Sequence, residues 1–136
     1  IFSFLSLKGA SLILMLKHYL TKDVFRAGIE VYLHNHNYGT AQSDDLWDSI
    51  NEITNGTLDV KTIMKTWILH KGFPLVTVVR KGKIISVQQE KFLYRMEPEN
   101  LTSDASHLWH IPLTYITSRC NFTHCTNAYL LDQKSG

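Results

Sequence analysis

The sequence predicts an α+β fold in which helices fill the first half of the chain and antiparallel strands the second. Apolar residues recur at spacings of three and four as far as Trp67, whereas β-branched and aromatic residues dominate from Leu75 onwards. Between these regions, Lys71-Gly72-Phe73-Pro74 combines a cation for the last helical turn, a glycine for a left-handed cap and a proline that cannot continue a helix. We therefore expect two unequal domains, residues 1–72 and residues 73–136.

The helical half divides into four short amphipathic segments. Their apolar stripes cover residues 12–19, 24–33, 46–53 and 60–67. Thr21, Ser43 and Asp59 are the predicted N-caps of the second, third and fourth helices. Asp44 and Asp45 follow Ser43, where negative charge opposes the positive end of the helix dipole. Short connections between such helices predict antiparallel hairpins that pack on one another.

The second half carries the period-2 pattern of strands. The predicted strands cover residues 75–80, 84–89, 109–115 and 128–131, with a further alternation at Phe92 and Tyr94. Lys81-Gly82-Lys83 is a hairpin signal between the first two strands. Pro112 has no N–H for a ladder, so its strand is expected at an edge or at a bulge. Four or five short antiparallel strands with one apolar face predict a small β-sandwich or part of one.

Composition and charge exclude several functions. A chain of 136 residues with 44% hydrophobic content can bury a real core. The net charge is only +2, and the densest basic patch, Arg80 to Lys83, falls at a hairpin tip, so nucleic acid is excluded as a partner. No apolar run approaches the roughly 20 residues that span a bilayer, so any membrane anchor is expected outside this chain. Because Ile1 starts inside an element, we expect the chain to be part of a longer protein.

Three N-glycosylation sequons indicate a lumenal or extracellular compartment. They begin at Asn55, Asn100 and Asn121, and all three fall where turns or loops are predicted. Such triplets also arise by chance in a chain rich in Ser and Thr. Cys120 and Cys125 flank the last sequon. They could close a disulfide across a hairpin or remain two unpaired thiols, because two cysteines specify no framework.

No complete active site is predicted within the chain. The histidine pairs are His34 with His36, two residues apart in a helix, and His107 with His110, three apart near a strand. Neither spacing brings both side chains to one point, so we expect no zinc site here. A phosphate-binding loop, a nucleophile elbow and a catalytic Cys/His signature are all lacking.

Three carboxylates share one predicted helical face: Asp45, Asp48 and Glu52. They could be acid and base groups. A solvated face that complements the helix dipole is the favoured interpretation.

Five blocks of sequence follow one another along nearly the whole chain: LKGASLILML, NYGTAQSDDLWDSI, DVKTIMKTWILHKGFPLVTV, QQEKFLYRM and LWHIPLTYIT. These blocks strongly resemble the M1 family of zinc aminopeptidases and, within it, the oxytocinase subfamily. The block around Trp67 and Pro74 is the most specific. The resemblance implies that residues 1–72 are the last helices of a thermolysin-like catalytic domain. It also implies that residues 73–136 begin the β-sandwich domain that follows.

The resemblance further implies a function for the longer protein. M1 enzymes remove single residues from the N-termini of peptides with one zinc ion. They work in lumenal or extracellular space on type II membrane anchors, at the plasma membrane, the endosome or the endoplasmic reticulum. The expected partners are peptide substrates. A homodimer of the longer protein is a possible assembly. The family's HExxH helix, further Glu ligand and GAMEN loop would lie upstream of Ile1, so zinc is expected outside this chain.

The opening of the chain departs from the family at one functional position. M1 sequences read Ile-Phe-x-x-Leu-Ser-Tyr-x-Lys-Gly, and this Tyr donates to the oxyanion of the tetrahedral intermediate. Here the stretch is one residue shorter, and the Tyr is absent between Ser6 and Leu7. Phe2 matches the position whose ring lines the pocket for the substrate's N-terminal side chain. Ile68 and His70 replace the usual Thr and Gln, which affects packing more than chemistry.

Two classes of function therefore remain. The chain is part of a zinc aminopeptidase, or it belongs to a non-catalytic descendant that keeps the scaffold and binds peptides or partners. A third interpretation is that the missing Tyr reflects an error in the sequence. In every case the chain alone is predicted to be inactive.

Overall fold

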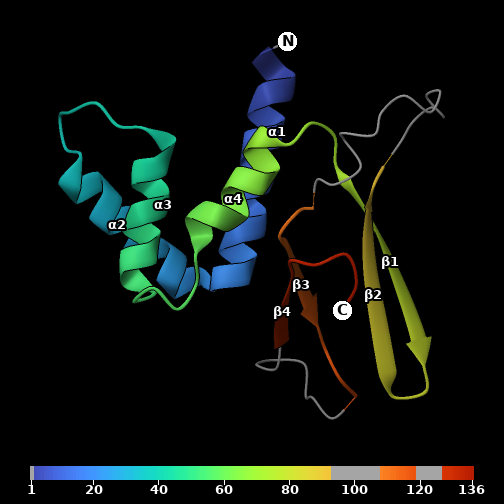
Figure 1. The fold of residues 1–136 in the computed structure, drawn as a ribbon. Helices are drawn as coiled ribbons and strands as arrows, with labels where there is room; N and C mark the ends of the chain where they lie inside the picture. The colour runs from blue at the N-terminus through green and yellow to red at the C-terminus, as the bar shows by residue number, and fades with distance from the viewer. Residues whose placement is uncertain (1, 93–107, 119–126) are drawn as a thin grey trace.

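A computed structural model describes residues 2–92, 108–118 and 127–136, and these form four helices beside two small antiparallel sheets (Figure 1). The elements are α1 Phe2–Leu20, α2 Lys22–Asn35, α3 Ser43–Ile53, α4 Val60–Leu69, β1 Pro74–Lys81, β2 Ile84–Lys91, β3 Ile111–Tyr115 and β4 Asn127–Leu131. The predicted α+β fold is confirmed. Secondary structure changes between Leu69 and Pro74, as the sequence predicts, while the division into two domains at Gly72 stays a prediction.

The helices enclose a common apolar core. Its buried members are Leu16, Leu20, Trp47, Ile50, Val60 and Met64, from α1, α3 and α4. Burial of each such side chain contributes about 1.5–3 kcal/mol. The backbone of α2 joins through Gly28, which lies so close to α3 that a Cβ there would come within 2.6 Å of Ile50 Cγ1. None of the described helices is long and apolar enough to cross a membrane.

Two of the three predicted N-caps need correction. Asp59 caps α4 as expected, because its Oδ1 accepts the Thr62 N–H at 3.0 Å. Thr21 occupies the N-cap position of α2, but its side chain makes no capping hydrogen bond. Gln42, not Ser43, is the N-cap of α3. The reason is that the Asp45 carboxylate turns back and accepts the Gln42 N–H at 2.6 Å, which moves the first helical position to Ser43.

The strands form two hairpins. In the first, β1 and β2 pair in antiparallel register, and Lys81 pairs directly with Ile84. The turn is therefore one residue shorter than the predicted Lys81-Gly82-Lys83 loop, and Gly82 supplies a φ of 64° for it. In the second hairpin Pro112 of β3 pairs with Leu130 of β4, and a two-stranded sheet makes β3 an edge strand as expected. Phe92 lies just past β2, and Tyr94 lies outside the described residues.

A second apolar core lies between the two hairpins and α4. Its buried members are Val87, Trp109, Ile111 and Leu131, and Trp67, Val76 and Leu113 pack against them. The predicted apolar face from Trp109 to Tyr115 is thus buried at its start, while Tyr115 is exposed. The apolar stripes predict that Trp47, Trp67 and Trp109 are all buried, and Trp47 and Trp109 are. Trp67 is only half-buried, because it lies on the surface of α4 that faces the strands.

Candidate functional site

The positions that the resemblance connects to catalysis lie in the first turns of α1. This helix is continuous from Phe2 to Leu20 and carries the N-terminus past the rest of the helices (Figure 1). Residues 7–11 are exposed, and Leu7 is 63% exposed, whereas packing against the helical core begins at Leu12. The side chains of Phe2 and Ser6 lie outside the described residues. Leu7 offers no hydrogen-bonding group to a substrate.

The described residues that hold the helices to the strands meet at Trp109 and His110. The Trp67 Nε1–H of α4 donates to the His110 carbonyl oxygen at 2.8 Å. The His110 N–H donates to Thr66 Oγ1 at 3.1 Å, and this hydroxyl in turn donates to the Ile63 carbonyl at 2.8 Å. Two neighbouring side chains of one helix thus satisfy both main-chain groups of His110.

Gln89 of β2 holds the adjacent residue in the same manner. It is only 2% exposed. Its Oε1 accepts the Trp109 N–H at 2.9 Å, and its Nε2 donates to the Trp109 carbonyl at 2.9 Å and to the Gln133 carbonyl at 2.8 Å. Buried polar groups cost stability unless they are paired, so this amide fixes the segments before β3 and after β4 against β2. We call Thr66, Trp67, Gln89, Trp109 and His110 the junction.

The His70 ring packs against the junction. The ring meets the buried Trp109 indole edge-on, with centroids 5.5 Å apart and planes at 84°. Aromatic pairs favour this arrangement. His70, one of the two positions that depart from the family, thus packs against Trp109, and the effect of that departure stays a prediction. The buried Trp109 Nε1 has no hydrogen-bond partner within residues 2–92, 108–118 and 127–136.

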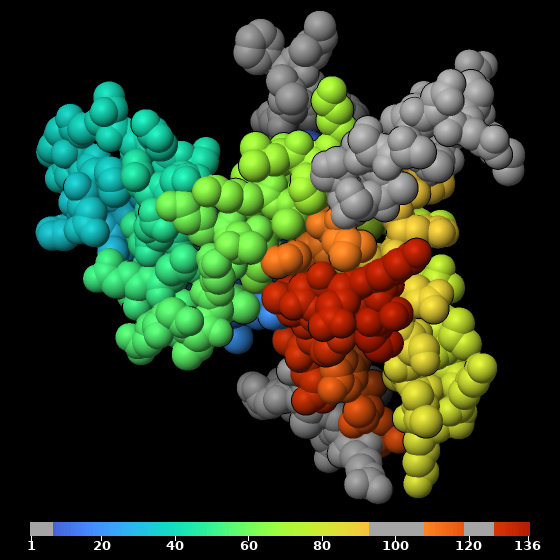
Figure 2. Space-filling view, viewed as in Figure 1, coloured from blue at the N-terminus to red at the C-terminus, as the bar shows by residue number. Residues whose placement is uncertain are grey.

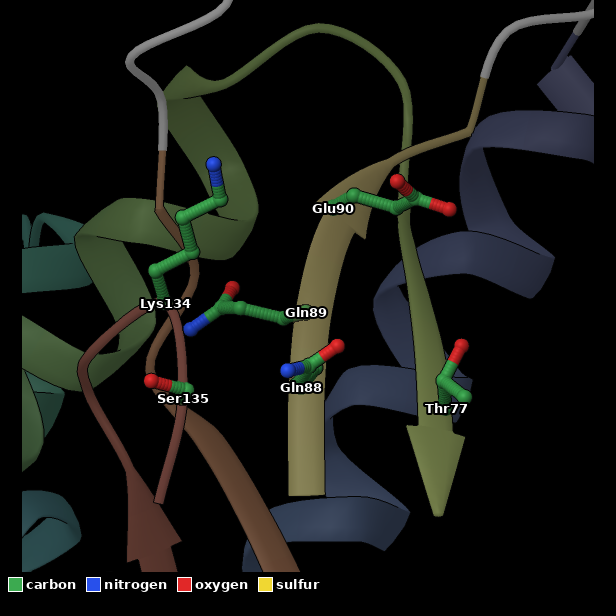
Figure 3. A pocket seen from close by; sticks show the side chains of 6 residues that line it. All are labelled: Thr77, Gln88, Gln89, Glu90, Lys134 and Ser135. Atoms are coloured by element: carbon green, nitrogen blue, oxygen red, sulfur yellow. The ribbon is translucent and has the colours of Figure 1, made fainter. Parts of the chain in front are cut away.

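A small polar hollow lies beside the junction. Its volume is about 170 Å³, and Thr77, Gln88, Gln89, Glu90, Lys134 and Ser135 line it. Figure 3 shows the Gln89 side chain reaching from β2 towards the segment that carries Lys134. A hollow of this size can hold a few water molecules or one side chain, which is too little for a peptide.

The predicted histidine pairs do not form a metal site in the described structure. His34 is exposed near the end of α2, and His36 Nε2 lies 3.6 Å from Asp45 Oδ2. His107 lies outside the described residues, and the main chain of His110 belongs to the junction. No three His, Cys, Asp or Glu side chains of the described ranges come close enough together to hold a metal ion.

Of the three carboxylates predicted to share one face of α3, Asp48 pairs with α4, Asp45 accepts the Gln42 N–H and Glu52 is exposed. Lys61 Nζ lies 2.8 Å from Asp48 Oδ2 and 3.4 Å from Asp44 Oδ2, and Lys65 Nζ lies 3.5 Å from the same Asp44 oxygen. Burial raises the pKa of Asp44, but the hydrogen bonds and charges of both lysines outweigh it and hold this pKa below its ordinary value. These exposed pairs align α3 with α4. Surface pairs of this kind contribute little stability each.

One of the three predicted sequons can be placed. Asn55 is exposed in the turn between α3 and α4 and has a φ of 51°. Thr57 of the same sequon is also exposed, and its hydroxyl donates to the Thr54 carbonyl at 2.7 Å. Asn100, Asn121, Cys120 and Cys125 lie outside the described residues, so the disulfide and two of the glycosylation sites stay predictions.

A family model described as the peptidase family M1 domain matches residues 2–67, which run from the start of α1 to the Trp67 of the junction. The chain is also 37% identical over 142 residues to endoplasmic reticulum aminopeptidase 1 of Homo sapiens, an alignment that covers 86% of this chain. It belongs to peptidase family M1. The same identity and share hold over 145 residues with endoplasmic reticulum aminopeptidase 2 of Bos taurus. Glutamyl aminopeptidase of Rattus norvegicus is 36% identical over 110 residues, or 79% of this chain.

This M1 chain spans a small part of the M1 relatives that it matches. The alignments cover 15% of the two endoplasmic reticulum aminopeptidases and 11% of the glutamyl aminopeptidase. Sequence reasoning found Trp67 in the family block but missed Thr66 and Gln89. The available signal for Gln89 was an amide on the same strand face as Val87, where an apolar residue is expected.

Proposed function

We propose that this chain contributes the end of the catalytic domain and the start of the following β domain of a zinc-dependent M1 aminopeptidase. The longer protein would remove single residues from peptide N-termini. One observation carries the proposal: the M1 match extends through α4 to Trp67, the residue whose side chain bonds to the strands. The boundary would then fall at residues 72 and 73, with the junction as the contact between the domains.

Within the family we propose the oxytocinase subfamily. The blocks over residues 37–50 and 59–78 support it, since they resemble insulin-regulated (leucyl-cystinyl) aminopeptidase. The names of two relatives, both endoplasmic reticulum aminopeptidases, agree with peptide processing in a lumenal compartment.

The zinc ion of this proposal would be bound by residues outside the chain. The donor set of the described residues does not fit it, since zinc in a catalytic site takes three protein ligands. When bound, such an ion polarises the scissile carbonyl and activates water. The part of this chain that would face it is the start of α1, where Phe2 would line the pocket for the substrate's N-terminal side chain.

The missing Tyr would weaken catalysis in either alignment of the helix. If the one-residue gap relative to the family lies after the Tyr position, Leu7 occupies that position. If the gap lies before it, Ser6 occupies that position. Neither side chain reaches as far as a Tyr hydroxyl. One residue fewer in a continuous helix also turns everything upstream by about 100° and moves it about 1.5 Å along the axis. Phe2 would therefore face a different direction relative to Leu12 and the core.

The second candidate function is a non-catalytic M1 scaffold that binds peptides or partner proteins. The observation that favours it is the lack of a hydrogen-bond donor at Leu7. A scaffold would keep the junction and the helical core, since both serve folding, and would lose turnover but not peptide binding.

Metal content and hydrolysis distinguish the two candidates. We expect the longer protein to bind one zinc ion and to hydrolyse an aminoacyl reporter slowly, and a chelator should abolish that hydrolysis. The 136-residue chain should do neither. A longer protein with stoichiometric zinc but no measurable hydrolysis would favour the scaffold. A longer protein without zinc would contradict the proposal that it is a zinc-dependent enzyme.

The proposed location is the lumenal or extracellular side of a membrane, with a type II anchor outside this chain. Asn55 supports this proposal because its side chain is exposed in a tight turn, the kind of site where a glycan can be attached. After expression in a secretory pathway, an amidase that removes N-glycans should increase electrophoretic mobility. Thr57→Ala should remove the Asn55 share of that change, whereas Thr57→Ser should keep it.

A further inference from the structure

An apolar groove separates the two hairpins. Its volume is about 1020 Å³. Val78, Ile85 and Val87 form one wall, from β1 and β2, and Leu113, Tyr115 and Tyr129 form the other, from β3 and β4. Gly136 lies at one end of the groove, and Arg80 and Lys83 lie at the hairpin-tip end.

The last described residues already pair with β2 at the edge of this groove. The Gln89 N–H donates to the Lys134 carbonyl at 2.9 Å, and Val87 and Gly136 exchange two hydrogen bonds of 2.9 Å. An antiparallel bridge joins Gln88 to Ser135 between them. Figure 2 shows this C-terminal segment in red beside β2 in yellow.

The same edge of β2 continues past this pairing towards Ile85. Along an antiparallel strand, every second residue turns its N–H and C=O to the same side. Gln89 and Val87 face the C-terminal segment, so Ile85 is the next residue on that side. In the part of the chain that the structure describes, no hydrogen bond reaches the Ile85 main chain on this edge. An open edge beside an apolar groove is a template for a further strand.

We propose that the groove holds a further β-strand of the same polypeptide, running on from Gly136 antiparallel to β2 and pairing with Ile85. The inference rests on the proposed function only in taking the chain as part of a longer M1 protein. Three features carry it: the established pairing at Val87, the open Ile85 edge directly ahead, and the groove that starts at Gly136.

The walls of the groove define the sequence that this strand needs. Val87, Leu113 and Tyr129 require apolar side chains at alternate positions. Arg80 and Lys83 stand where the strand would leave the groove, since it runs towards the hairpin tip, and they favour an acidic residue there. Stacked walls of this kind would make the two hairpins parts of one sandwich.

Amide hydrogen exchange on the longer protein tests the proposal. We expect the Ile85 N–H to exchange on the order of 100-fold more slowly than in a variant whose six residues after Gly136 are changed to Gly and Pro. The Ser86 N–H is the internal control, because it faces β1 and should stay protected in both proteins. This readout does not depend on hydrolysis, so it remains informative if the proposed activity fails.

A pair of substitutions provides a second test that does not require the altered strand to fold. Ile85 and Ile84 are both exposed in the described structure, at 53% and 69%, but only Ile85 lines the groove. In the longer protein Ile85→Lys should lower the unfolding temperature and speed exchange at Val87, while Ile84→Lys should do neither. Equal effects of the two substitutions, a fast Ile85 N–H, or protection that disappears on dilution would overturn the proposal, the last in favour of a second copy.

Discussion

The indole Nε1–H of Trp67 donates a 2.8 Å hydrogen bond to the carbonyl of His110, which lies 43 residues further along the chain. Thr66, the preceding residue of α4, accepts the His110 N–H. Two side chains on one helical turn therefore fix both main-chain groups of a residue at the start of the second hairpin. This arrangement joins α4 to the start of the second hairpin through neutral hydrogen bonds.

Trp67→Phe should lower the free energy of unfolding by about 1 kcal/mol, because it keeps an aromatic ring but leaves the His110 carbonyl without its donor. Chemical denaturation of the purified chain measures this difference. Ile68→Ala is the control, since Ile68 is an exposed neighbour that faces away from the junction. A Trp67→Phe protein as stable as the native chain would show that the hydrogen bond does not stabilise the junction.

Gln89→Leu should cost more, roughly 2–4 kcal/mol, because it removes the partner of the buried Trp109 N–H and carbonyl and also that of the Gln133 carbonyl. The matched control is Gln88→Leu, one residue away on the exposed face of the same strand. Urea denaturation of both variants checks the prediction. Comparable losses at the two positions would mean that the buried amide is not what joins β2 to Trp109.

The sequence was sufficient to predict the helices and strands, but it did not predict the side-chain contacts of the junction. Periodicity and the Gly72-Pro74 stop predicted four helices, the β1–β2 hairpin and β4, because local propensity and pattern decide these. Thr66 carried no local signal, and Gln89 carried only an amide where an apolar residue is expected, because the two side chains bond to main-chain groups 44 and 20 residues away, respectively. Such partners depend on tertiary packing, which periodicity does not report.

The N-cap of α3 shows that propensity alone can also misplace the start of a helix. Ser43 is a better N-cap by propensity than Gln42. The Asp45 carboxylate nevertheless moves the start of the helix by bonding the Gln42 N–H. Trp67 was placed correctly on a stripe of α4, but the stripe alone could not show that it packs on the strands rather than in the helical core.

Gly28→Ala should destabilise the chain by about 1–3 kcal/mol, because the new Cβ would lie 2.6 Å from Ile50 Cγ1 and 3.2 Å from Ile50 Cα. The matched substitution is Gly9→Ala in α1, where nothing lies within 4 Å of the added Cβ. It should stabilise by up to about 1 kcal/mol through helix propensity. Thermal unfolding of both variants measures the difference, and a harmless Gly28→Ala would contradict the close approach of α2 to α3.

Asp59→Ala should show a pH-dependent loss of stability. Hydrogen bonds from the side chain and the main chain of Thr62 hold the pKa of Asp59 below its ordinary value. A lowered pKa in the folded state stabilises the fold above the unfolded pKa of about 3.9, and this stabilisation is lost as pH falls through the folded value. The variant should therefore lose about 1 kcal/mol at pH 7 and progressively less below pH 4 or so.

Denaturation of Asp59→Ala and Asp59→Asn across this range checks the sign. Asn keeps an oxygen that can cap α4 but does not titrate. Near neutral pH, Asp59→Asn should therefore lose less stability than Asp59→Ala. A loss in Asp59→Ala that grows on acidification would show that the carboxylate does not act as the cap.

Turnover of the longer protein with and without a Tyr inserted between Ser6 and Leu7 tests the account most directly. Loss of one oxyanion donor typically costs about 10²–10³ in turnover. We predict that the unmodified protein turns over an aminoacyl reporter slowly and that the insertion raises this rate by about that factor, while both proteins bind peptide N-termini. An unmodified protein that already matches the insertion variant would contradict the account, because some other group would then supply the donor.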